Sequence, residues 1–157
     1  DVTCDDLQFL VSWPPAVIGT HLMSLQLVQN NAARLLSRST QHQHITPTLK
    51  HLHWLRIKYC VSFKVLTLIH CALHNDDAPQ YMRTLFTLHK PGRALRSSDD
   101  EWRLTVPRSH CYYGNRSVQV YGAKLWNSLP ANVRAPISAY SFKRLLKTVL
   151  FRSAFKL

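Results

Sequence analysis

Apolar residues recur at steps of three and four along most of this chain, a spacing that predicts a mainly α-helical fold. The first such stretch runs from Thr20 to Arg38, where the recurring positions are Leu22, Leu25, Gln29, Ala32 and Leu36. Residues 1–19 contain a double proline and lack this pattern. We therefore expect an irregular entry segment over residues 1–19 and a single helical module over residues 20–157.

A second pattern predicts the central helix. Residues 57–73 carry apolar side chains on nearly every side of a helix, which is typical of a buried element. Short helices are expected on either side of it, from Thr48 to Trp54 and, after Pro79, from about Tyr81 to Phe86.

The periodicity fails after Thr87, and we expect a loop with one small β-hairpin over about residues 87–113. The hairpin strands would be residues 95–98 and 103–107, on either side of an acidic tip. Asn115 is the expected N-cap of the next helix, which carries Gly122 and Trp126 and ends before Pro130.

The last helix has the clearest amphipathic pattern. Ser138 or Ser141 can serve as its N-cap. Its apolar stripe consists of Phe142, Leu145, Leu146, Val149 and Leu150. Three basic residues fall off this stripe, namely Lys143, Arg144 and Lys147.

Charge points to a class of partner. The chain has 20 lysines and arginines against 8 aspartates and glutamates, a formal net charge of +12, and it contains no acidic residue after Glu101. A surface of one sign repels itself unless a polyanion lies against it, so the charge predicts contact with the phosphate backbone of RNA or DNA. A ribosomal or membrane-surface protein could carry a similar charge, so charge alone selects no function.

Length and composition indicate a folded intracellular protein. With 157 residues and 46% hydrophobic content the chain can bury a core. No apolar run approaches the ~20 residues that span a bilayer, and the four cysteines lack paired spacing, which indicates reduced thiols in the cytoplasm or nucleus. The chain begins at Asp1 without a signal-peptide pattern, and we interpret it as a fragment of a longer protein.

The candidate nucleic-acid contacts are basic residues on predicted helix faces and in the loop, together with two loop tyrosines that could stack on unpaired bases. They are Arg34, Arg38, Arg93, Arg96, Arg103, Arg108, Tyr112, Tyr113, Arg116, Lys143, Arg144 and Lys147. The aromatic residues within apolar stripes are predicted to lie in the core, namely Trp54, Phe63, Trp126 and Phe142.

No metal site and no catalytic residue are assigned. His70 and His74 lie one helical turn apart with Cys71 between them, but no further ligand is supplied to complete a zinc site. The eight carboxylates cluster in three places, and none is positioned to orient a base beside a cysteine.

A series of short motifs runs through the chain in order: Leu25-Gln-Leu-Val-Gln-Asn30, Ala32-Ala-Arg-Leu-Leu36, His44-Ile-Thr-Pro47, Leu52-His-Trp-Leu55, Phe63-Lys64, Ala72-Leu73, Ala78-Pro79-Gln80-Tyr81, Arg96-Ser-Ser98, Val106-Pro-Arg108, Tyr113-Gly114-Asn115-Arg116, Leu125-Trp-Asn-Ser-Leu-Pro130, and Ser141-Phe-Lys143 with Leu146-Lys147. Each motif is weak by itself. In this order and spacing, from about Cys4 to Phe151, they resemble the C-terminal region of the reverse transcriptase of non-LTR (LINE-type, jockey/CR1-like) retrotransposons, downstream of the polymerase palm.

The resemblance implies a fragment of a larger polymerase whose palm, with its magnesium-binding aspartates, lies outside this chain. Asp5 and Asp6 invite a reading as those aspartates. However, the residues that lead into Leu25 align better with a segment after the palm, and the next acidic residue is Asp76. The parent is thus implied to be an RNA-directed DNA polymerase, and this chain is expected to hold no cofactor and to be inactive alone.

The leading hypothesis is a non-catalytic module that binds the RNA or DNA backbone through basic helices and the loop. Its expected partners are nucleic acid and the upstream polymerase domains, without a membrane. An alternative is a structural module that packs on the polymerase thumb or palm, and a third is a decayed transposon remnant without function.

Overall fold

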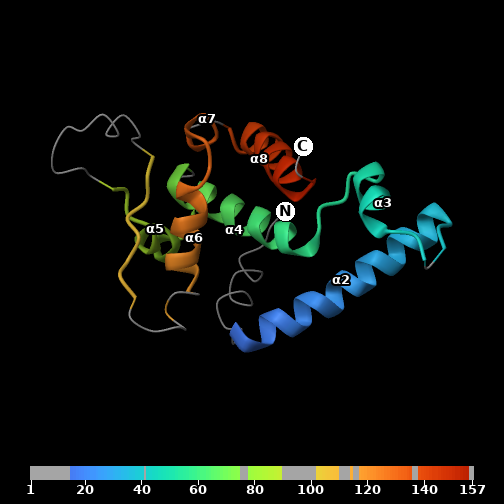
Figure 1. The fold of residues 1–157 in the computed structure, drawn as a ribbon. Helices are drawn as coiled ribbons and strands as arrows, with labels where there is room; N and C mark the ends of the chain where they lie inside the picture. Colours follow the sequence, from blue (N-terminus) through green and yellow to red (C-terminus); the bar gives the residue numbers. More distant parts are fainter. Residues whose placement is uncertain are drawn as a thin grey trace. The chain divides into compact units, whose positions relative to one another are not determined.

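The computed structural model describes residues 15–40, 42–74, 78–89, 102–109, 114, 117–135 and 138–155, with side chains from residue 22 onward. The helices in these ranges are α2 (Pro15–Ser37), α3 (Ile45–His51), α4 (Ile57–His74), α5 (Gln80–Leu85), α6 (Val118–Asn127), α7 (Ala131–Arg134) and α8 (Ala139–Phe155) (Figure 1). The prediction of a mainly helical fold is confirmed.

The chain divides into two compact units. The first unit comprises residues 1–61 and 148–157, and the second comprises residues 62–147. The helices α4 and α8 therefore each contribute residues to both units.

Two glutamines hold α2 to the start of α4 in the first unit. The Gln26 side-chain oxygen accepts a hydrogen bond from the backbone N–H of Ile57 at 3.0 Å. The Gln29 amide donates to the Leu55 carbonyl at 2.7 Å, and the Gln26 amide donates to the Gln29 side-chain oxygen at 2.8 Å. Because the first N–H groups of a helix have no partner within that helix, Gln26 caps α4 from a distant part of the sequence.

The helix α2 begins earlier than predicted, and only part of the predicted stripe is covered: Leu22, Gln29 and Ala32 are half-buried. It starts at Pro15, so residues 15–19 are helical where an irregular segment was expected; a proline without N–H is tolerated in the first turn. Ala33 is fully buried, whereas Leu25 and Leu36 of the predicted stripe are 50% and 65% exposed. Period alone does not select the buried face, because this helix carries apolar residues on more than one side.

The helix α3 begins three residues before the predicted start, and a left-handed residue follows two positions after its end. Pro47 lies in its first turn, where a missing N–H costs nothing, and the His44 side chain accepts a hydrogen bond from the Thr46 N–H at 3.4 Å. After the helix, His53 has a φ of 53°. Leu49 and Leu55 are buried in this unit.

The end of α8 contacts the same unit. The Tyr59 hydroxyl donates to the Ser153 carbonyl at 3.3 Å. The rings of His53 and Phe151 lie 5.6 Å apart.

The core of the second unit is built on α4, as the apolar pattern predicts. Ile69 and Leu66 on α4 are fully buried, as are Trp126 on α6 and Phe142 and Leu146 on α8. Fully burying a large apolar side chain contributes about 1.5–3 kcal/mol relative to exposure, so these side chains dominate the stability of the unit. Trp126 and Phe142 thus occupy the core as predicted, whereas Trp54 and Phe63 are only half-buried.

Gly122 permits α6 to approach α4 and α5 closely. A Cβ atom at this position would lie 2.9 Å from Cδ1 of Ile69 and 3.4 Å from Cε1 of Phe86. A larger residue would force the tip of the Ile69 side chain to move, so packing favours glycine here.

Among the described residues, residues 103–105 of the predicted β-hairpin form an antiparallel bridge with residues 87–89, which were not their expected partner. Leu104 pairs with Leu88, and the backbone bonds join His89 N to Arg103 O at 2.7 Å and Thr105 N to Thr87 O at 2.9 Å. The other predicted strand, residues 95–98, lies outside the described residues. The Asn127 side chain bonds both backbone groups of Leu104, which ties this segment to α6.

Two helix caps refine the sequence prediction. Ser117, and not Asn115, caps α6, since its hydroxyl accepts a hydrogen bond from the Val120 N–H at 3.3 Å. Of the two serines proposed for α8, Ser138 has the capping geometry: its hydroxyl accepts from the Ser141 N–H at 3.3 Å.

Candidate nucleic-acid interface

The first half of α8 presents the predicted basic face to solvent. Lys143, Arg144 and Lys147 are all exposed. They lie at positions i, i+1 and i+4, so their side chains leave one side of the helix within about one turn of each other. The structure therefore brings these three predicted residues together.

The opposite side of α8 explains why this face is held outward. Phe142 and Leu146 are fully buried, and the Phe142 ring stacks on His70 with centroids 4.1 Å apart. Trp126 contacts the same ring at 5.8 Å. Leu145 of the predicted apolar stripe is 41% exposed, because it lies at the edge of the stripe and not at its centre.

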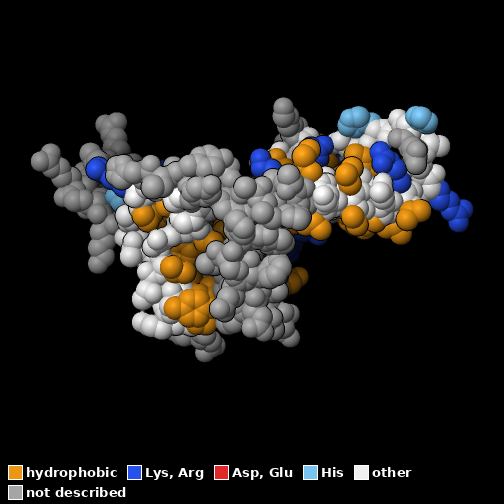
Figure 2. Space-filling model, turned by 90° about the horizontal axis from the view of Figure 1, so that it is seen from below, with side chains coloured by type: hydrophobic (Ala, Val, Ile, Leu, Met, Phe, Trp, Pro, Cys, Tyr) orange, Lys and Arg blue, Asp and Glu red, His pale blue; other side chains and the backbone are white. Residues whose placement is uncertain are grey.

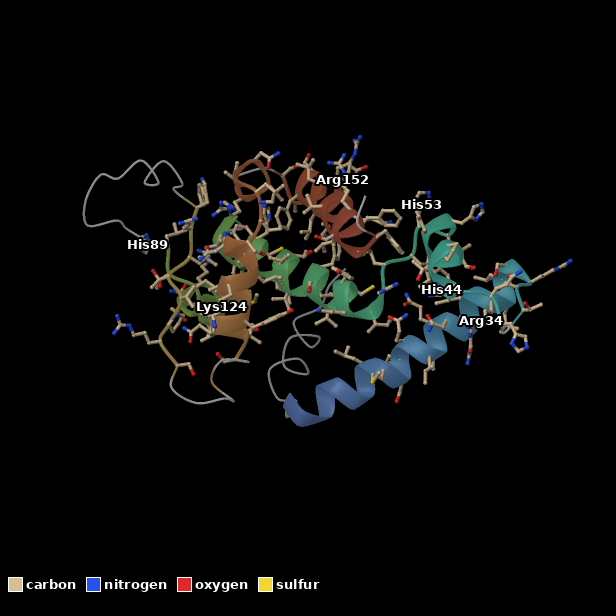
Figure 3. The ribbon with its side chains drawn as sticks, viewed as in Figure 1. Arg34, His44, His53, His89, Lys124 and Arg152 are labelled. Carbon is tan, nitrogen blue, oxygen red and sulfur yellow. The ribbon has the colours of Figure 1, made fainter. Side chains whose placement is uncertain are left out.

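The predicted contacts on α2 are arranged differently from the expected outward line. Arg34 is half-buried, and its Nε is enclosed without a hydrogen-bond partner among the described residues. Arg38 follows the end of α2 with a φ of 50°, so it leaves the helical path and does not continue the face that carries Arg34. Figure 3 shows Arg34 on α2 and His44 at the start of α3.

Exposed Lys50 adds positive charge to this unit beside several histidines. His42, His44, His51 and His53 are exposed around α3. Arg56, in contrast, donates a hydrogen bond to the Thr46 hydroxyl at 2.9 Å, which gives it a structural role.

The predicted loop contacts are only partly described. Arg103 and Arg108 are exposed on the segment 102–109, which the buried Leu104 anchors. The remaining predicted contacts, Arg93, Arg96, Tyr112, Tyr113 and Arg116, lie outside the described residues.

Several exposed residues of suitable chemistry were not among the sequence-predicted contacts. Lys124 on α6 and Arg152 on α8 are exposed (Figure 3), and so is Tyr140 at the start of α8. The signal for Tyr140 is present in the sequence, because lysine or arginine follows it at i+3, i+4 and i+7. Tyr140 lies only two residues before Phe142, so helical spacing places it on the side of α8 opposite the apolar stripe.

The charged side chains among the described residues all have the same sign. All eight aspartates and glutamates of the chain lie outside the described residues, so the described parts carry positive formal charge only. Figure 2 correspondingly shows lysine and arginine side chains but no acidic ones among the coloured atoms. On α8, whose sequence contains no aspartate or glutamate, neighbouring cations add their fields.

Two thiols and one half-buried histidine have shifted pKa values. Burial raises the pKa of Cys60, and burial likewise raises that of Cys71, with the Lys143 ammonium acting in the opposite direction. A raised thiol pKa leaves less of the nucleophilic thiolate at neutral pH. Burial lowers the pKa of His74, whose ring lies 4.6 Å from that of His70 and 4.5 Å from that of Trp102.

Within the described ranges, no three histidine, cysteine or acidic side chains are grouped as a metal site would require. Asp5 and Asp6 lie outside those ranges. Among the helices with defined positions, none is both long enough and apolar enough to cross a bilayer.

Comparisons with protein-family models, with curated proteins and with solved structures find no match to this chain.

Proposed function

We propose that this chain binds the phosphate backbone of nucleic acid through the first half of α8. One observation carries the proposal: Lys143, Arg144 and Lys147 are exposed together on a helix whose opposite side is locked into the core by Phe142 and Leu146. A rigid helix that presents adjacent cations holds them ready for phosphate oxygens without a large cost in ordering.

No aspartate or glutamate occurs within α8 or anywhere after Glu101, so this helix supplies no carboxylate of its own to weaken the field at this face. Lysine and arginine on a mixed surface are usually neutralised by neighbouring carboxylates, and such a surface binds phosphates weakly. Here the net charge of +12 favours association with a polyanion. The affinity should fall steeply with salt, because each neutralised phosphate releases counterions.

The resemblance to LINE-type reverse transcriptases gives this binding a context. In that context the chain is a non-catalytic module that grips template RNA or target DNA, while a palm elsewhere in the polymerase carries magnesium and performs synthesis. The chain alone is then expected to bind nucleic acid and not to polymerise.

The test is a titration of labelled RNA and duplex DNA by fluorescence anisotropy at several salt concentrations. Replacing Lys143, Arg144 and Lys147 together by glutamine removes three phosphate contacts, so the slope of log affinity against log salt should become shallower by roughly 2 to 3. The matched control replaces Lys50, Lys58 and Lys124 by glutamine, which changes the net charge equally. Equal loss in both variants, or an unchanged slope in the α8 variant, would contradict the proposal.

A second candidate is a structural module that packs on other polymerase domains. The observation that favours it is the exposed apolar face of α2, where Met23, Val28 and Leu35 are 73%, 66% and 82% exposed (Figure 2). A surface of this kind is typical of an interface. The same titration separates the candidates, because a purely structural module should show weak binding in the wild-type chain and no special effect of the α8 variant.

A further inference from the structure

Tyr140 stands on the basic face of α8 in an unusual setting for an aromatic residue. Its side chain is 78% exposed, more than that of any other described tyrosine. By contrast, Tyr121 on α6 is 40% exposed and its hydroxyl lies 3.4 Å from the Ser62 hydroxyl. Tyr121 is therefore tied to the core, whereas Tyr140 offers most of its ring to solvent.

The neighbours of Tyr140 along the helix are cations. Lys143, Arg144 and Lys147 follow it at i+3, i+4 and i+7, the positions that share a helix face with residue i. All four side chains are exposed, and all four residues belong to the second unit. The ring and the three cations thus form one continuous surface on a single rigid element.

This combination matches the chemistry of unpaired nucleic acid. Proteins that bind single strands pair a positively charged track for the phosphates with aromatic rings on which bases stack. A duplex keeps its bases stacked on one another and offers no free base face to a ring on a helix surface. Phosphate contacts alone would not distinguish single strands from duplexes, but an exposed ring beside them does.

We propose that Tyr140 is a base-stacking platform and that the surface formed by Tyr140, Lys143, Arg144 and Lys147 prefers single-stranded nucleic acid to duplex. The inference rests on the proposed function, because it adds a base contact to the phosphate contacts of the same helix. The ligand chemistry is an unpaired base within a sugar–phosphate chain, which both RNA and DNA single strands supply.

The serine that caps α8 supports this role. Ser138 bonds to the Ser141 N–H and fixes the first turn, from which Tyr140 projects. Since the turn is already ordered, stacking on the ring loses little backbone entropy.

The test compares Tyr140→Leu, Tyr140→Phe and Tyr140→Trp in the full chain. The probes are labelled oligo-U RNA, oligo-dU DNA, a duplex DNA of equal length, and a backbone oligomer without bases. Tyr140→Leu should weaken binding of both base-bearing single strands by roughly tenfold. Tyr140→Phe and Tyr140→Trp keep a ring and should retain binding. Affinity for duplex and for the baseless backbone should not change, and the stronger of the two single-strand affinities identifies the preferred sugar.

Tyr81→Leu on α5 is the matched control. Tyr81 is 55% exposed but has no lysine or arginine at i+3, i+4 or i+7, so its loss should leave all affinities unchanged. Circular dichroism and the melting temperature verify that each variant is folded.

Two outcomes overturn the inference: single-strand affinity that survives Tyr140→Leu, or a loss that extends equally to the baseless backbone. If either result is found while the Lys143, Arg144 and Lys147 substitutions still make the salt dependence shallower as expected, the phosphate-binding proposal is retained. Failure of the wild-type chain to bind any of the probes overturns both.

Discussion

At the scale of single residues, burial turns His74 into a pH-sensitive position. Its Nε2 is enclosed without a hydrogen-bond partner among the described residues, and its ring lies between those of His70 and Trp102. Desolvation disfavours the charged imidazolium, which lowers the pKa of His74 in the folded chain.

The lowered pKa predicts that folding stability decreases on the acid side. In the unfolded chain His74 takes up a proton near its ordinary pKa of about 6.5, whereas in the folded chain it stays neutral to a lower pH. Below about pH 6.5 the unfolded state therefore binds more protons, and stability falls until the folded pKa is passed. Thermal melts between about pH 7.5 and about pH 5.5 should show a flatter profile for His74→Gln than for the wild type. The exposed His51→Gln is the control, and identical slopes for wild type and His74→Gln would refute this assignment.

Residue-scale sequence rules identified some caps and missed others. Ser138 was one of two serines expected at the start of α8, and its hydroxyl takes the capping bond. Asn115 is as good a capping residue as Ser117 in type, but the helix starts at Val118 and Ser117 immediately precedes it. Which of the two residues caps the helix depends on the position at which the helix begins. Residue type alone does not determine that position.

At the scale of elements, α2 is held in place by polar side chains as well as by packing. Gln26 accepts a hydrogen bond from the first residue of α4, and its amide donates to Gln29 and to the Asn30 side-chain oxygen at 2.9 Å. These hydrogen bonds connect α2 to α4. Hydrophobic periodicity does not predict them, because glutamine is a polar residue.

Removing this connection should destabilise the first unit. Gln26→Ala leaves the Ile57 N–H without its side-chain partner, which should lower the free energy of unfolding by about 1 kcal/mol, in the range of a lost helix cap. Urea denaturation followed by circular dichroism measures the change. Asn31→Ala, at an exposed position of the same helix, is the control and should have little effect. A Gln26→Ala variant as stable as the control would show that the hydrogen bonds of Gln26 contribute no net stability.

At the scale of the whole molecule, unbalanced charge opposes compactness. A net charge of +12 in 157 residues creates repulsion that the folded chain must withstand. Repulsion between surface charges is screened by salt over a Debye length of about 10 Å at 0.1 M.

The melting temperature should therefore rise when sodium chloride is increased from about 0.02 M to about 0.3 M, because screening relieves the repulsion in the folded state more than in the expanded one. The Lys143, Arg144 and Lys147 triple glutamine variant has less charge to screen and should show a smaller rise. Differential scanning fluorimetry provides the comparison. A melting temperature that falls with added salt in the wild type would mean that local attractive pairs, and not net repulsion, dominate.

The sequence by itself determined the helical character, the positions of α4 and α8, and the basic face of Lys143, Arg144 and Lys147. These features depend on local periodicity and on the placement of charged residues, both of which can be read along a single segment. Only the tertiary structure decided which side of α2 is buried and that residues 103–105 pair with 87–89. These features depend on contacts between segments that are far apart in the chain. The local sequence is compatible with more than one such contact, so it does not select among them.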